Sequence, residues 1–299
     1  MSSMKIAVLS SCSAESVHFI REVGAHHQIS VVLRVRPTDA SRTGIDVRRW
    51  SANRILRALE RRLFYGYHYG RIERRLAERL AATHARLPDL EVIDVPHHRV
   101  NSEETVRLLQ RLSIDLLIVI GCPLLKRPVF AAPRYGAINV HYGIAPEYRG
   151  ENTIFWALYH RDFHNLGVTV HQVDATVDAG PILGRAFVSV APTDDEVALL
   201  AKATRVAAAL TDDILASWGS GAVFSAQRHR GRNFRKADRR IWHDLIMWSR
   251  RNLAKERLPA LPERREFMRP LARSGVDGEL PGPCLASMSE TQPMPPGVS

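Results

Sequence analysis

The N-terminal part of the chain alternates short apolar runs with an amphipathic stretch. Lys5–Ser10 and Ile29–Val35 are rich in aliphatic and β-branched residues, which predicts two strands. Between them, Ser16–Val23 places apolar residues at helical spacing, which predicts a helix. Strand, helix and strand in this order form a right-handed crossover, so we expect the two strands to be parallel.

The same alternation continues along the chain and predicts an α/β fold with a mostly parallel central sheet. Ile114–Ile120 is apolar at nearly every position, which is typical of a central strand buried on both faces. Helices are predicted at Ser102–Arg111 and Val197–Trp218. The other predicted strands are Glu91–Val95, Gly136–Val140, Gly167–Val173 and Arg185–Val190.

Two segments interrupt this alternation. A helical pattern over residues 47–87 predicts an insertion, which either packs on the core or caps a site. Residues 241–257 predict a further helix, and we expect its Trp242 and Trp248 in the core. The predicted organisation is a main domain over 1–220, a basic helical extension over 221–270, and a disordered tail over 271–299, where Pro, Gly and Ser accumulate.

Charge and hydropathy limit the class of protein. The 299 residues contain 42 Lys and Arg against 31 Asp and Glu, which gives a net charge of +11. The excess lies mainly in residues 42–79 and 228–273, which either contact nucleic acid or acidic partners or form solvated helix faces. The longest apolar stretch, Ile114–Leu125, is shorter than the roughly 20 residues of a membrane-spanning helix, so we expect no membrane partner.

The cysteines and the N-terminus indicate a reduced, cytoplasmic protein. Cys12, Cys122 and Cys284 are widely spaced and form no CxxC pattern, which argues against a structural zinc site or a disulfide framework. The first 16 residues, MSSMKIAVLSSCSAES, are less apolar than a secretory signal. The sequence does not predict the oligomeric state.

One group of polar residues suits acyl transfer to an amine. Asn139 and His141 end a predicted strand and, two residues apart, point to the same face. An Asn amide donates to a developing oxyanion, and His moves a proton near neutral pH. Asp178, in a tight turn, supplies a carboxylate that favours the charged imidazole. A structural histidine, or a metal site formed with His171, remains an alternative, although no metal-ligand spacing is present.

The same residues carry a resemblance to a known family. The segments GAINVHYGIAPEYRGENTIFWAL and GVTVHQVDATVDAGPIL resemble the folate-dependent formyltransferases, which include methionyl-tRNA formyltransferase, glycinamide ribonucleotide formyltransferase and the sugar N-formyltransferases. The shared pattern is an Asn-x-His strand end, a loop ending in YRG, a GVT strand and an Asp-x-Gly-Pro turn. It extends over about residues 114–190, with weaker support from 4–36.

The resemblance implies a Rossmann-like core and 10-formyltetrahydrofolate as the formyl donor. It implies that Asn139, His141 and Asp178 are catalytic, with an amine attacking the formyl carbon directly. Asn139 and protonated His141 would stabilise the oxyanion, and Asp178 would hold His141 charged. Donor-binding positions also follow from the resemblance, at Leu124, Leu125, Asp174 and Ala175.

The acceptor is predicted from departures from the family. Residues 221–299 show no series of short alternating strands, so the β-barrel domain of methionyl-tRNA formyltransferase is expected to be absent. The loop that usually contains SLLP is GIAP here, with Gly143 in place of Ser. We therefore expect a small-molecule amine, such as an amino sugar or a natural-product intermediate. Methionyl-tRNA, hydrolysis of the donor by water, and a non-catalytic nucleic-acid-binding role are the alternatives.

Overall fold

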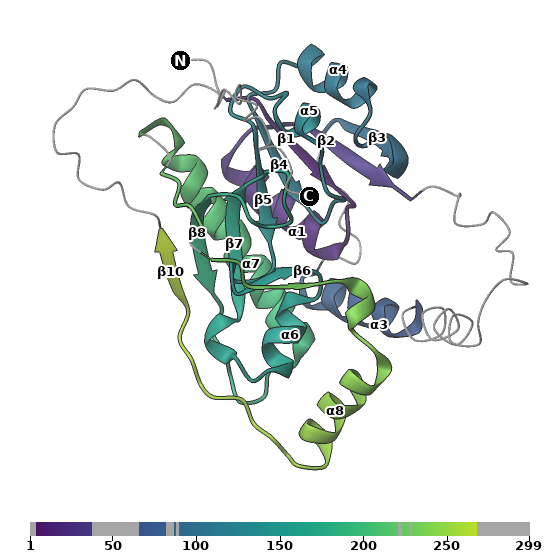
Figure 1. Ribbon diagram of the computed structural model, residues 1–299, viewed down its shortest axis with the longest axis vertical. Coiled ribbons are helices and arrows are strands. Elements are labelled where there is room, and N and C mark those ends of the chain that lie inside the picture. The colour runs from purple at the N-terminus through teal and green to yellow at the C-terminus, as the bar shows by residue number, and fades with distance from the viewer. Residues whose placement is uncertain are drawn as a thin grey trace, which may run out of the picture.

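The computed structural model describes residues 4–37, 66–81, 87, 90–220, 223–227 and 229–267. They fold around an eight-stranded sheet with the order β10-β8-β7-β5-β4-β1-β2-β3 (Figure 1). Its strands are β1 (Ile6–Ser10), β2 (Ile29–Arg36), β3 (Val92–Pro96), β4 (Leu116–Ile120), β5 (Ala137–His141), β7 (Gly167–Gln172), β8 (Ile182–Phe187) and β10 (Arg264–Phe267). Strands β6 (Tyr148–Gly150) and β9 (Arg232–Phe234) form a separate parallel pair.

Strands β1 to β5 pair in parallel, which confirms the predicted α/β class with a mostly parallel central sheet. Strand β4 is buried at every position because both faces of the sheet are covered. Strands β7, β8 and β10 continue the sheet in antiparallel fashion. The transition from parallel to antiparallel pairing therefore lies between β5 and β7, beside Asn139 and His141.

Helices cover both faces of the sheet. Helices α1 (Ala14–His26) and α7 (Glu196–Ala216) pack against each other and against one face, and Phe19 and Leu199 are fully buried there. The opposite face is covered by α4 (Glu103–Arg111) and α5 (Arg127–Phe130) through Leu109 and Val129. The other helices are α3 (Gly66–Arg79), α6 (Thr153–Tyr159), α8 (Ile241–Asn252) and the short 3-10 turns His97–Arg99, Phe163–Asn165, Trp218–Ser220 and Lys236–Asp238.

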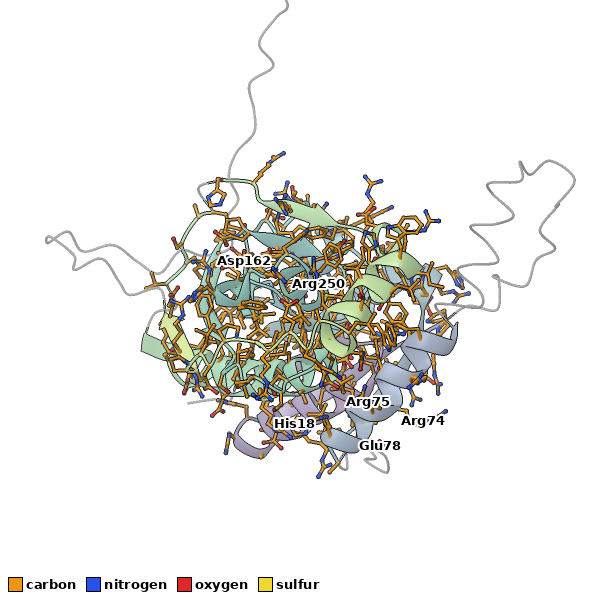
Figure 2. All side chains as sticks on the ribbon, turned by 90° about the horizontal axis from the view of Figure 1, so that it is seen from below. His18, Arg74, Arg75, Glu78, Asp162 and Arg250 are labelled. Carbon is orange, nitrogen blue, oxygen red and sulfur yellow. The ribbon has the colours of Figure 1, made fainter. Side chains whose placement is uncertain are left out.

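The described part of the predicted insertion is helix α3. Residues 47–65 and most of 82–89 lie outside the described residues. Leu76 of α3 and Leu80, which directly follows this helix, pack on Val197 and Ala201 of α7, so α3 is fixed to the core. Figure 2 shows α3, with Arg74, Arg75 and Glu78 labelled, lying beside α1 and its His18.

The chain after residue 220 differs from the expected helical extension. It contains α8, but also β9, which pairs with β6, and β10, which forms the edge of the main sheet beside β8. Ser225 and Leu261 add isolated bridges to Ile182 and Val190. This segment therefore crosses back over the main domain and is partly strand (Figure 1). The boundaries of the predicted domains stay a prediction, and the predicted tail at 271–299 lies outside the described residues.

None of the described helices is both long enough and apolar enough to cross a membrane.

Candidate active site

Two predicted catalytic side chains project from the end of β5. Asn139 and His141 share one face of the strand because they are two residues apart. In the antiparallel pairing with β7, His171 lies directly opposite Asn139. The Asn139 Nδ2 atom is 3.1 Å from His171 Nε2, so the switch in strand direction brings a second histidine to the site.

Asp178 connects these groups. Its Oδ1 accepts a hydrogen bond from Asn139 Nδ2 at 3.0 Å, and its Oδ2 accepts one from the Gly150 N–H at 2.8 Å. The same carboxylate is 3.4 Å from His141 Nδ1 and 3.4 Å from His171 Nε2. The structure thus brings the three residues predicted from sequence into one hydrogen-bonded group and adds His171, which sequence reasoning weighed only as a metal ligand.

Both ring nitrogens of His141 face hydrogen-bond acceptors. Nε2 lies 2.8 Å from the Tyr148 carbonyl oxygen, which can only accept a hydrogen bond. Nδ1 faces Oδ2 of Asp178, a second acceptor. Two acceptors around one buried imidazole match a ring that carries protons on both nitrogens. Gly143 leaves room for this ring, since a Cβ at that position would stand 2.6 Å from His141 Nε2.

The surroundings of Asp178 keep its carboxyl ionised. Burial alone would raise its pKa, but His141, His171 and the Gly150 N–H outweigh burial and hold that pKa far below its ordinary value. The carboxylate is therefore a fixed negative charge at neutral pH. It orients the amide of Asn139 and the ring of His141 at the same time.

The turn that carries Asp178 is held by side chains that the sequence did not single out. Asp178 has φ +45°, in the left-handed region, so its backbone needs support. Gln227 Nε2 donates to the carbonyl oxygens of Asp178 and Gly180, at 3.0 and 2.8 Å. Buried Arg149 donates to the Val177 carbonyl at 3.3 Å. No signal in the sequence identifies Gln227, because its role depends on a contact between distant segments.

A cavity of about 1300 Å³ opens beside these residues at the carboxyl ends of β1, β4 and β5. Asn139, His141, His171 and Asp178 line it. Among the predicted donor-binding residues, Leu124, Leu125 and Asp174 also line the cavity, whereas Ala175 is exposed and is not part of its wall. The position of the cavity follows the general rule for ligands in parallel sheets.

Helix α3 and the C-terminal segment form another part of the wall. Tyr69 of α3 donates from its hydroxyl to Asn152 Oδ1 at 2.6 Å, which connects the helix to the loop after β6. Glu73, Arg235 and Lys236 also line the cavity. The helical segment therefore both packs on the core and closes one side of the site, so the two sequence interpretations of the insertion are compatible.

Glu15 is an unusual group in this wall. Its Oε2 is enclosed and has no hydrogen-bond partner in the described structure. Burial, together with the nearby carboxylate of Glu73, raises the pKa of Glu15 to about 6. Ser13 and the backbone hydrogen-bond to this carboxylate but leave Oε2 unsatisfied, so the group suits a ligand that offers a hydrogen-bond donor or positive charge.

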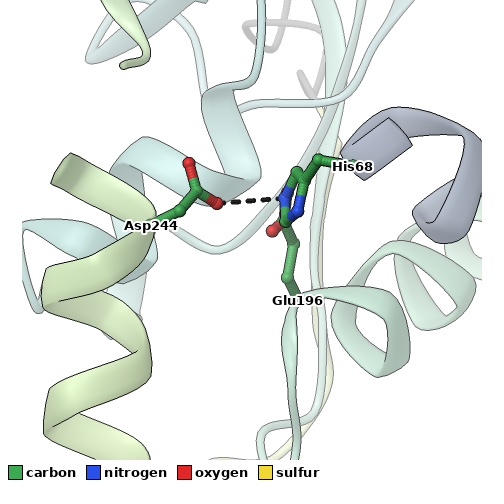
Figure 3. A group of neighbouring side chains, drawn as sticks. All are labelled: His68, Glu196 and Asp244. Carbon is green, nitrogen blue, oxygen red and sulfur yellow. Dashed lines mark ion pairs between the residues drawn. The ribbon is translucent and has the colours of Figure 1, made fainter. Parts of the chain in front are cut away.

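A possible metal-binding group lies at the edge of the cavity. Of the residues described, His68, Glu196 and Asp244 are the group whose ligand atoms lie within 4.8 Å of one another (Figure 3). However, the guanidinium of Arg239 donates to both carboxylates, at 2.7 Å to Glu196 and 2.5 Å to Asp244. A cation thus already neutralises this group, which does not fit a metal centre.

The chain is similar to known proteins over its central part. Residues 73–211 match the formyl transferase family model. The chain is 37% identical over 109 residues to the methionyl-tRNA formyltransferase of Thermosynechococcus vestitus, covering 36% of this chain and 33% of that protein. It is 31% identical over 155 residues to the enzyme of the same name from Acidothermus cellulolyticus, covering 52% and 46%. The chain thus spans about a third to a half of the length of these curated relatives.

Solved structures share the fold. A sugar N-formyltransferase from a Shewanella species superposes with a TM-score of 0.50 at 16% identity, covering 79% of this chain and 78% of that one. A 4-N formyltransferase from Francisella tularensis gives a TM-score of 0.50 at 15% identity, covering 79% and 77%. Over residues 73–211, the part that contains Asn139, His141 and Asp178, this chain is similar to the formyl transferase family.

Proposed function

We propose that this protein transfers a formyl group from 10-formyltetrahydrofolate to the amine of a small molecule. The observation that carries the proposal is the hydrogen-bonded group of Asn139, His141 and Asp178 on the wall of a large cavity. This group provides an oxyanion donor, a charged imidazole and a fixed carboxylate. The described residues place no Ser or Cys nucleophile in contact with it, so the acceptor amine itself attacks the formyl carbon.

The chain's own residues stabilise charge and move protons in this reaction. Asn139 and His141 stabilise the negative charge that develops on the formyl oxygen. Both amide hydrogens of Asn139 are engaged, by His171 and by Asp178, so one of them must be released to the substrate. Asp178 keeps His141 charged and assists removal of the amine proton. The bond from the formyl carbon to the new nitrogen forms while the bond to the folate nitrogen breaks.

The cavity has the features needed for the donor. Apolar Leu125 and half-exposed Leu124 follow the central strand β4, where a flat ring system would contact both side chains and backbone. Asp174, in the loop before Asp178, lines the same space. We assign these three residues to donor binding. Ala175 is retained as a backbone contact from the resemblance alone, because its side chain does not reach the cavity.

A small acceptor is supported by the residues that close one side of the cavity and by the sugar N-formyltransferase among the structures of the same fold. Tyr69 and Asn152 close one side through their hydrogen bond. Glu15 supplies an enclosed carboxylate that an amine-bearing ligand can satisfy. An amino sugar or an amino-containing natural-product intermediate has the size and the donors for this space.

Methionyl-tRNA is the second candidate acceptor. The names of the curated relatives and the net charge of +11 favour it, since phosphate contacts dominate affinity for RNA. Two further alternatives remain. Hydrolysis of the donor by water would use the same cavity, and a non-catalytic role in binding nucleic acid would use the basic surface. These alternatives differ in what they release and in what they bind.

Formyl release from 10-formyltetrahydrofolate distinguishes these functions. The assay uses the purified protein without an acceptor, with a panel of amino sugars, and with methionyl-tRNA. Transfer predicts release only with an amine, a product that is heavier by one formyl group, and a loss of about 10²-fold or more in rate for Asn139→Ala. Equal release without any amine indicates hydrolysis. Stimulation by methionyl-tRNA alone identifies the second candidate, and a salt-dependent shift of tRNA without release indicates nucleic-acid binding.

A further inference from the structure

Helix α8 turns its apolar side chains away from the protein. Leu245 is 57% exposed and Trp248 is 55% exposed, although both are large and apolar. We define the α8 patch as the exposed apolar residues of this helix and the residue that follows it: Ile241, Trp242, Leu245, Ile246, Trp248 and Leu253. The expectation that Trp242 and Trp248 lie in the core is therefore wrong.

The opposite side of α8, which faces the protein, is mainly polar, with Met247 as its apolar contact to the core. His243 packs edge-on against the Trp156 ring, with the ring centroids 4.9 Å apart. Arg250 lies on the side of the helix that faces the molecule, and it donates to the Tyr159 carbonyl at 2.7 Å (Figure 2). Surface helices normally show the reverse arrangement, with apolar residues inward. A contiguous exposed apolar patch of this kind marks a binding surface.

Basic residues lie at both ends of the helix. Arg240 precedes α8 and stands 4.4 Å above the Trp242 ring. Of the acidic residues close to the helix, Asp244 is paired with Arg239 and Glu256 with Arg161, and the exposed Asp238 accepts a hydrogen bond from the Arg235 N–H. The α8 patch is therefore apolar in its centre, with Arg240 at its start and the exposed residues Lys255 and Arg257 after its C-terminus.

This distribution of charge selects among possible occupants. A second copy of the chain, docked through the same patch, would place positive ends against positive ends in either a parallel or an antiparallel arrangement. The patch lies on a single helix at the edge of the molecule (Figure 1). A helix with Trp and Leu outward and Arg at its flanks matches the pattern of helices that lie in a lipid interface.

We propose that the α8 patch docks on the surface of a membrane that contains anionic lipids. Trp242, Leu245 and Trp248 enter the headgroup region, and the basic residues at both helix ends contact lipid phosphates. Docking is peripheral and requires no spanning helix. The inference goes beyond the proposed formyl transfer and departs from the expectation, drawn from the sequence, that the protein has no membrane partner.

Co-sedimentation of the full chain with vesicles tests the proposal. We compare vesicles of phosphatidylcholine alone with vesicles that also contain phosphatidylglycerol, at low and high salt. We expect partitioning into the anionic vesicles to be at least about tenfold stronger, and to fall with salt, because each basic residue near the surface contributes on the order of fivefold. The double variant Leu245→Ser with Trp248→Ser should lose about tenfold or more of this binding.

Matched controls separate docking from folding. Tyr135→Ser removes an exposed aromatic residue, 42% exposed, in the loop before β5, and should bind vesicles like the wild type. The thermal midpoint of the double variant should equal that of the wild type, since both of its positions are mainly solvated. Quenching of tryptophan fluorescence by brominated lipid tests, in the wild-type chain, whether tryptophan side chains enter the bilayer. Equal or absent binding to both kinds of vesicle would overturn the proposal, as would a dimer that the double variant abolishes without any vesicle binding.

Discussion

At the scale of single residues, one carboxylate organises the whole site. Asp178 accepts hydrogen bonds from Asn139 and from the Gly150 N–H and also faces two histidine rings. These contacts stabilise the folded protein only when every partner of the carboxylate is in place, because a buried charge without a partner is strongly destabilising. Side chains that fix the backbone of Asp178 therefore affect catalysis although they do not touch the substrate.

Gln227 is the clearest such positioning residue. Gln227→Ala removes both hydrogen bonds to the carbonyls of the Asp178 turn. We expect kcat for formyl transfer to fall about tenfold or more with little change in KM, because small displacements of catalytic groups are costly. Gln227→Glu, which has the same shape but no amide donors, should behave like Gln227→Ala. Gln110→Ala, on the exposed side of α4, is the matched control and should leave both parameters unchanged. The same kcat in the wild type and in all three variants would show that Gln227 does not position Asp178.

Glu15 predicts a pH-dependent gain in stability. Its pKa is about 6 in the folded protein against an ordinary value of 4.5, so the ionised form is disfavoured on folding. Above pH 6 the wild type bears this cost, and Glu15→Gln should raise the free energy of unfolding by about 2 kcal/mol. Below pH 4.5 both states are protonated and the gain should disappear.

Urea unfolding of Glu15→Gln at several pH values measures this difference. Glu22→Gln changes the same charge on the exposed side of α1 and should stay within about 0.5 kcal/mol of the wild type. A gain that is the same at pH 4 and pH 8 would show that the burial of charge at Glu15 is not its cause.

At the scale of elements, Arg239 connects three helices. It is fully buried and binds Glu196 at the start of α7 and Asp244 in α8, while its guanidinium stacks 3.6 Å above the Phe155 ring of α6. His68 of α3 contacts the same Asp244 at 3.0 Å (Figure 3). The group thus fixes α8, and the cavity wall beside it, to the main sheet.

Replacing Arg239 should be strongly destabilising. Arg239→Met leaves Glu196 and Asp244 as uncompensated charges, and breaking a buried pair in this way costs about 3–5 kcal/mol. Arg257→Met, at an exposed position after the same helix, should change stability by less than about 0.5 kcal/mol. Chemical denaturation of the two variants provides the comparison. A loss below about 1 kcal/mol in Arg239→Met would mean that the group contributes little to holding α8.

The sequence predicted elements better than it predicted which side of an element faces the core. The parallel strands and the helix predicted from Ser102 are confirmed, because periodicity is a local property, and the Ser102 hydroxyl caps this helix by accepting a hydrogen bond from the Thr105 N–H. Strands β9 and β10 were not predicted, since their residues, RNF and RREF, lack apolar alternation. Trp242 and Trp248 follow helical spacing, but spacing does not tell which side of a helix faces the core.

The candidate site was predicted to a similar extent. Asn139 and His141 follow from strand geometry, and Asp178 follows from its place in a tight turn and from the family resemblance. His171 and Gln227 could not be predicted, because their contacts depend on the antiparallel register of β5 with β7 and on the return of the chain after α7. Ala175 was placed by backbone position alone, and its side chain lies outside the cavity wall.

At the scale of the whole molecule, the segment after residue 220 completes the main fold. Strand β10 extends the main sheet, β9 pairs with β6, and Gln227 hydrogen-bonds to the turn that carries Asp178. Gly150, which donates its N–H to Asp178, lies so close to Phe234 of β9 that a Cβ there would collide with the Phe234 carbonyl. The site and the C-terminal segment are therefore built together.

Truncation tests this interdependence. A chain that ends at residue 220 should lose formyl transfer and unfold at a lower temperature than the full chain. In that chain β8 lacks its neighbour β10, β6 lacks its partner β9, and the turn of Asp178 lacks Gln227. A chain that ends at residue 267 retains all three contacts and should match the full chain in both measurements. A truncation at 220 that keeps full activity would show that the first 220 residues form a self-sufficient catalytic domain.

The most direct test of the central claim is the rate of formyl transfer from 10-formyltetrahydrofolate by wild type and by Asp178→Asn, with the amine that best stimulates release. Asp115→Asn, at the far end of β4, is the matched control. The account predicts a loss of about 10²-fold or more in kcat for Asp178→Asn, because the amide no longer holds His141 charged, and no loss for Asp115→Asn. Transfer at the wild-type rate in Asp178→Asn would contradict the assignment of this site.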